Sequence, residues 1–139
     1  MRGMRKVCVF CTALFAVLLL GGASRTPTIS IQIESPATGT EVAMETVVKG
    51  RVSDPKANVF VLVHPLRAKP WWVQRIPAPA NRDGSWQTLC YFGDATAGLD
   101  EEFQIVAIVS PRKLKERQTL NEVPKDVVRS EVVTVKRTR

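Results

Sequence analysis

Apolar and polar residues alternate in several short runs between residues 29 and 137. In the first run, Ile29, Ile31 and Ile33 alternate with polar residues, which is the period-two pattern of a strand with one buried face. The same alternation recurs in four later runs, at residues 46–52, 85–92, 102–110 and 130–137. In the run at 46–52, Gly50 lies on the apolar face, where it permits a close backbone approach or a bulge. These runs predict strands with one buried face.

Two further strands are expected between residues 52 and 85. Every position from Val59 to Val63 is apolar, so this segment predicts a central strand that is covered on both faces. A shorter strand is expected at residues 71–76, directly before Pro77. Residues 111–126 are the one stretch where a helical turn or two is expected.

Strands of this length and spacing favour an all-β fold. About seven short strands within about 110 residues are typical of an immunoglobulin-like, two-sheet antiparallel β-sandwich. A closed barrel is the alternative architecture. The Cys…Trp…Cys arrangement of true immunoglobulin domains is absent from the sequence, so the expected likeness is one of architecture.

The N-terminus has the order of a secretory signal. The basic stretch "MRGMRK" precedes an apolar run at residues 7–20, which is followed by the small residues "GGAS". The apolar run is shorter than the roughly 20 residues that a membrane-spanning helix needs. We therefore expect a signal peptide at residues 1–24, a β-sandwich domain at residues 25–139, and an exported protein that is periplasmic or secreted.

Removal of this signal changes what the cysteines and charges imply. Cys90 would be the one cysteine left, so no internal disulfide is expected, and its place on an apolar face predicts a buried thiol.

Residues 112–139 carry nine basic and four acidic side chains, and we interpret them as a solvated basic face. Weak contact with anionic membrane lipid through these basic residues is the alternative. Export argues against a nucleic-acid partner.

A family resemblance supports the same fold. The motifs "ESPATGTEV", "VKGRVSDP", "VFVLVHPL", "WWVQ" and "NRDGSW" occur in this order within residues 29–110. In this order they resemble an immunoglobulin-like module of exported bacterial and archaeal proteins. The resemblance implies an accessory or interaction module, and it brings no catalytic residues to this chain.

Two tryptophans and a tyrosine form the first candidate binding surface. Adjacent residues of a strand point to opposite faces, so one of Trp71 and Trp72 should be buried and the other exposed. Together with Gln74 and Tyr91, the exposed tryptophan can form an aromatic platform for a sugar or a protein partner. Alternatively, the loop at 66–70 or the C-terminal segment covers this surface.

The second candidate surface is apolar. If the strands at 59–63 and 102–110 pair, Val106 and Ile108 add an apolar patch outside the sandwich core, and such a patch usually marks an interface. Coverage of this patch by residues 111–126 is the alternative.

No group of residues indicates a reaction or a cofactor. His64 has no evident catalytic or metal-binding companions, and no Gly-x-Ser-x-Gly nucleophile motif is present. The acidic residues at positions 94 and 100–102 do not match a standard calcium loop. We therefore expect no cofactor, no metal site and no catalytic residues.

Together these features lead to two hypotheses. The leading one is an exported, non-catalytic binding or interaction module that engages a protein partner or a second copy of itself. The alternative is a carbohydrate-binding module that uses exposed tryptophan and tyrosine side chains.

Overall fold

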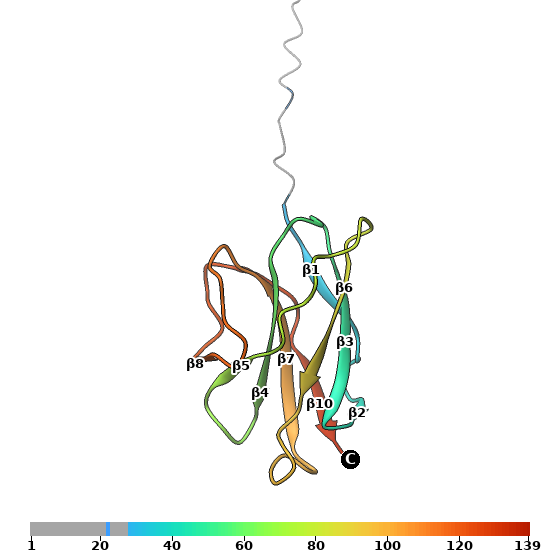
Figure 1. Cartoon of the computed structure of the whole chain (residues 1–139), viewed down its shortest axis with the longest axis vertical. Helices are drawn as coiled ribbons and strands as arrows, with labels where there is room; N and C mark the ends of the chain where they lie inside the picture. The colour runs from blue at the N-terminus through green and yellow to red at the C-terminus, as the bar shows by residue number, and fades with distance from the viewer. Residues whose placement is uncertain (1–21, 23–27) are drawn as a thin grey trace, which may run out of the picture.

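The computed structural model describes Gly22 and residues 28–139. The described chain is all-β, and its strands form two sheets (Figure 1). The expected signal peptide at residues 1–24, apart from Gly22, lies outside the described residues, as do residues 25–27. Within the described part, no helix is long and apolar enough to cross a membrane.

The smaller sheet has three antiparallel strands in the order β1-β3-β6. They are β1 (Ile31–Ser35), β3 (Glu45–Val52) and β6 (Ser85–Tyr91). In the middle of this sheet, Gly50 of β3 pairs with Ile33 on one side and with Trp86 on the other.

The larger sheet follows the order β2-β10-β7-β4-β5-β8, and β9 also pairs with β7. Its strands are β2 (Glu41–Val42), β4 (Val59–Pro65), β5 (Trp71–Val73), β7 (Glu102–Val109), β8 (Thr119–Leu120), β9 (Val128–Arg129) and β10 (Val133–Arg137). All neighbouring strands are antiparallel except β2 and β10, which are parallel. The prediction of a central strand at residues 59–63 is confirmed, because β4 lies between β7 and β5.

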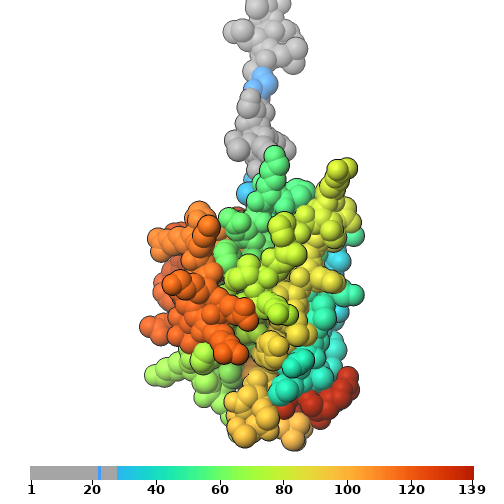
Figure 2. All heavy atoms as spheres, in the orientation of Figure 1, coloured from blue at the N-terminus to red at the C-terminus, as the bar shows by residue number. Residues whose placement is uncertain are grey.

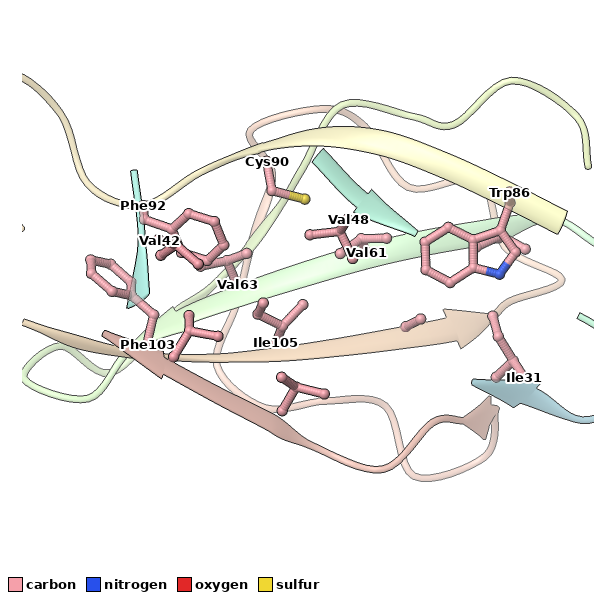
Figure 3. Close-up of a cluster of buried hydrophobic side chains, with 14 of the residues drawn as sticks. Ile31, Val42, Val48, Val61, Val63, Trp86, Cys90, Phe92, Phe103 and Ile105 are labelled. Atoms are coloured by element: carbon pink, nitrogen blue, oxygen red, sulfur yellow. The ribbon is translucent and has the colours of Figure 1, made fainter. Parts of the chain in front are cut away.

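The core lies between the two sheets, and the alternating runs supply it (Figure 3). Val48, Trp86 and Cys90 come from the smaller sheet, while Phe103 and Ile105 come from β7 of the larger one. All five side chains are buried, as the alternation predicts. Two sheets that enclose one apolar layer form a β-sandwich-like domain.

A second apolar layer covers the outer face of the larger sheet. Its buried members are Phe60, Leu62, Val73, Val106 and Ile108. The partly buried residues that pack against them are Trp71, Leu114, Leu120, Val123 and Val127. Most of these covering residues belong to the segment after β7, which is drawn in orange beside β5 and β8 in Figure 1. The larger sheet is therefore apolar on both faces.

This layer decides two expectations. Of the two alternatives for Val106 and Ile108, coverage by residues 111–126 is confirmed and an exposed apolar patch is wrong, because both side chains are completely buried beneath the covering segment. The expected helical turn at residues 111–126 is also wrong, because this stretch contains β8, which pairs with β5, and otherwise only turns and irregular chain. The extended chain lets widely spaced residues such as Leu114 and Leu120 reach the same apolar face.

The sheets differ in width, which leaves part of the larger one uncovered. The smaller sheet places β6 opposite β4 and β1 opposite β7. The strands β5 and β8 continue beyond β4 and so extend past the edge of the smaller sheet (Figure 1). Because Trp71 and Val73 contact the outer layer, Trp72 between them points to the inner side of this overhang.

Candidate binding groove

A groove of 670 Å³ lies where the larger sheet extends past the smaller one. Its lining comes from β5, the end of β6, residues 93–95 and the turn at residues 116–117. Met44, Val63 and Phe103 add apolar surface. In Figure 2 the orange residues before β8 and the golden residues of the loop after β6 lie on the same face of the molecule.

Two half-exposed aromatic side chains line this groove. Trp72 reaches it from β5 and Tyr91 from the last position of β6, and each has 42% of its surface exposed. The expected split of the tryptophan pair is observed, because Trp71 is partly buried against the outer apolar layer. The structure thus brings three of the candidate residues together, Trp72, Gln74 and Tyr91, while their role in binding stays a prediction.

His64 contacts Trp71, the partly buried member of the tryptophan pair. Its ring stacks on Trp71 with the ring centroids 4.8 Å apart and the planes at 25°. The Nδ1 atom of His64 lies 3.1 Å from the carbonyl oxygen of Pro70, within hydrogen-bond distance. Both contacts fix the loop that precedes β5.

Gln74 connects the two aromatic residues through their backbones. The side chain is buried, its Oε1 accepts a hydrogen bond from the Tyr91 N–H at 2.8 Å, and its Nε2 donates to the Trp72 carbonyl oxygen at 3.1 Å. Gln74 also lines the groove, and its expected contact with a ligand stays a prediction. Because both ends of its amide are engaged within the protein, it also positions Trp72 and Tyr91.

A buried arginine holds the loop that forms one wall of the groove. Arg137 of β10 is only 6% exposed, and its Nη1 donates to the carbonyl oxygens of Phe92, Asp94 and Ala97 at 2.9, 2.8 and 2.8 Å. Sequence reasoning missed this role by assigning Arg137 to a solvated basic face. The sequence feature that could have predicted its burial is its position two residues after Val135, on the buried face of the last strand.

The acidic loop around Asp94 is stabilised by hydrogen bonds within the loop. The Oδ1 atom of Asp94 accepts hydrogen bonds from the Thr96 N–H at 2.7 Å, the Thr96 hydroxyl at 2.9 Å and the Ala97 N–H at 2.8 Å. These hydrogen bonds, and the nearby charge of Arg137, lower the pKa of Asp94. Nowhere in residues 28–139 do three or more His, Cys, Asp or Glu side chains gather in a way that would hold a metal ion.

Arg117 reaches the groove from an unusual backbone conformation. Its φ angle is 66°, in the left-handed region that glycine favours, and its N–H donates to the Val73 carbonyl oxygen at 2.9 Å. Glu116 and Arg75 also line the groove. In the described part of the chain, neither Arg75 nor Arg117 takes part in an ion pair.

Cys90 belongs to the sandwich core and does not line the groove. Cys90 is completely buried, and burial raises the pKa of its thiol. We expect Cys90 to resist alkylation by iodoacetamide in the native protein and to react fully in guanidinium chloride, because only the exposed thiolate is a good nucleophile. Mass spectrometry of the peptide that contains Cys90 measures this. Rapid labelling of the native protein would contradict the packing of β6.

The comparisons with known proteins bear on the fold. The sequence matches no protein-family model and no curated protein. Among solved structures, the chain is similar to the endo-beta-1,4-mannanase from Thermotoga petrophila, with a TM-score of 0.50 and 14% sequence identity. The similarity covers 85% of this chain and 21% of that chain, so this chain spans about a fifth of the mannanase structure. At this level of identity the likeness concerns the fold alone.

Proposed function

We propose that the protein is an exported, non-catalytic β-sandwich domain that binds a glycan in the groove lined by Trp72 and Tyr91. The observation that carries this proposal is the presence of two half-exposed aromatic side chains in one groove. Aromatic faces pack against the apolar C–H faces of sugar rings. The groove volume of 670 Å³ also lies within the range of about 300–1,000 Å³ that is common for ligand sites.

An immunoglobulin-like topology is part of this proposal. The order β1-β3-β6 in one sheet and β10-β7-β4-β5 in the other corresponds to strands A, B and E opposite strands G, F, C and C′ of that architecture. In this correspondence, β8 extends the second sheet by one more short strand. The domain then functions as a scaffold, and the specificity lies in the loops and edges that it positions.

The burial of the outer apolar face favours a glycan over a protein partner. The hypothesis of a protein partner or of self-association depended on an exposed stripe at Val106 and Ile108, and these residues are covered. The groove, in contrast, is lined by apolar side chains together with a few polar groups, which is typical of small-ligand sites. The sequence pattern of a secretory signal supports export. Export would expose the groove to extracellular or periplasmic glycans.

Removing either aromatic side chain tests the proposal. We expect Trp72→Ala and Tyr91→Ala to weaken glycan binding at least tenfold, which corresponds to about 1.4 kcal/mol, because each loses a stacking surface. Isothermal titration calorimetry against a panel of soluble oligosaccharides measures this. The panel begins with a β-1,4-mannan oligosaccharide, since the structural neighbour is named for this polymer.

A matched control separates the groove from general surface effects. Val132 is an exposed apolar residue that does not line the groove, so Val132→Ala should bind as the unmodified chain does. Thermal unfolding of all three variants checks that they fold. The proposal is wrong if no glycan of a broad panel binds, or if Trp72→Ala retains full affinity.

A further inference from the structure

The backbone of Arg117 is the most unusual feature of the groove. An arginine in the left-handed region is uncommon, because its Cβ crowds the following carbonyl oxygen, whereas glycine has no such cost. The other non-glycine residue of the described chain with a positive φ is Asp100, at 60°, and aspartate is enriched in this conformation. Residues held in a strained conformation cluster at functional sites, so the position of Arg117 at the groove points to a function for its side chain.

The conformation is fixed by hydrogen bonds on both sides of Arg117. Its own N–H donates to the Val73 carbonyl oxygen at 2.9 Å, and the Val73 N–H donates to the Gln118 carbonyl oxygen at 2.9 Å. The Gln118 N–H in turn donates to the carbonyl oxygen of Lys115 at 3.0 Å. The turn is therefore attached directly to β5, the strand that carries Trp72, and it presents Arg117 to the same groove.

The groove is lined by equal numbers of guanidinium and carboxylate groups. Arg75 and Arg117 line it together with Glu116 and Asp94. The Asp94 carboxylate accepts hydrogen bonds from Thr96 and Ala97 of its own loop, and the buried Arg137, which donates to the Asp94 carbonyl oxygen, is a nearby positive charge. The four lining charges cancel, and Arg137, which does not line the groove, adds one positive charge behind its wall.

We propose that the groove selects an acidic glycan, and that Arg117 binds the carboxylate of a uronic acid while Trp72 and Tyr91 contact the sugar rings. This inference depends on the glycan binding proposed above and names its ligand class. The planar guanidinium offers two parallel N–H donors that match the two oxygens of a carboxylate. Arg75 contributes a second positive charge at the same groove.

The variant Arg117→Gly removes the guanidinium group while keeping the backbone conformation, so it distinguishes an effect on binding from an effect on folding. Glycine adopts the left-handed conformation without strain, so we expect the melting temperature to stay the same or to rise. The affinity for an oligogalacturonate should fall at least tenfold, while the affinity for a neutral β-1,4-mannan oligosaccharide of equal length should change less than twofold. Arg117→Lys should lose part of the preference, because lysine keeps the charge and lacks the bidentate geometry.

The matched control is Arg112→Gly, which removes an equal charge from an exposed position that does not line the groove. Titration calorimetry of both oligosaccharides at low and high sodium chloride gives the readout. A preference for the acidic sugar that salt and Arg117→Gly both abolish supports the proposal. Equal binding of both sugars by the unmodified chain overturns the acidic preference and leaves glycan binding intact. Binding of neither sugar, nor of any other glycan, overturns glycan binding itself.

Discussion

Replacing Gly50 with alanine will destabilise the protein by about 3 kcal/mol or more, which is a large part of the 5–15 kcal/mol that stabilises a typical domain. A Cβ atom at this position would overlap the carbonyl oxygen of Gln32 in the neighbouring strand and the indole ring of Trp86. A backbone oxygen within a paired strand cannot move aside without breaking the ladder. The absence of a side chain at Gly50 therefore allows the indole ring of Trp86, at one end of the core in Figure 3, to approach β3 closely.

Chemical denaturation of Gly50→Ala, followed by circular dichroism, measures this effect. Gly39→Ala is the comparison, because Gly39 has open space around its Cβ position and only its φ of 85° opposes the substitution, at about 1 kcal/mol. A second substitution, Trp86→Leu, should recover only part of the loss, since the overlap with Gln32 remains. Stability of Gly50→Ala within 1 kcal/mol of the unmodified chain would contradict the close packing of β1, β3 and Trp86.

The regular strands were predictable because their signal is local. Alternation along 29–34, 85–92 and 102–110 reports which side of a strand is buried, and in the structure those sides face the core, with Ile29, Ile33 and Val109 partly buried at its edge. The continuous apolar run at Val59–Val63 likewise predicted a strand covered on both faces, and β4 has this position. The close approach anticipated at Gly50 is also observed.

The candidate groove was less predictable because it depends on distant parts of the chain. It exists because the larger sheet extends past the smaller one, and the order of the strands in the sheets cannot be read from periodicity. The strands β2, β8 and β9 have two residues each, which is too short for any periodic pattern. The cover over Val106 and Ile108 comes from apolar residues that are separated by polar ones and lack a helical or strand period.

Arg137 illustrates the same limit for a charged residue. A charged side chain is usually expected at the surface. Arg137, however, lies on the same face of β10 as Val133 and Val135, and that face is buried. The guanidinium lies beneath residues 93–97, close to where a side chain at Gly93 or Gly98 would begin. A charge is stable there because three carbonyl oxygens accept from its Nη1 atom.

We therefore expect Arg137→Met to cost about 2–4 kcal/mol of folding stability and to release the loop at residues 93–97. Methionine preserves much of the side-chain length but leaves the carbonyl oxygens of Phe92, Asp94 and Ala97 without their donor. The carbonyl oxygen of Phe92 is the costliest to leave unpaired, because Phe92 is completely buried. The exposed loop can turn its other carbonyl oxygens to water, which limits the total loss.

Hydrogen exchange gives a readout of this loop that needs no ligand. The Asp94 N–H donates to the Ala97 carbonyl oxygen at 2.9 Å, so its exchange in Arg137→Met should accelerate well beyond the effect of lowered global stability. Lys136→Met changes an exposed neighbour in the same strand and should leave this exchange unaltered. Arg137→Lys should restore part of the protection, because one ammonium group replaces part of the guanidinium's donor set. If Arg137→Met leaves the exchange of Asp94 unchanged, the loop holds its own shape through the Asp94 carboxylate, and Arg137 serves only to fill the core.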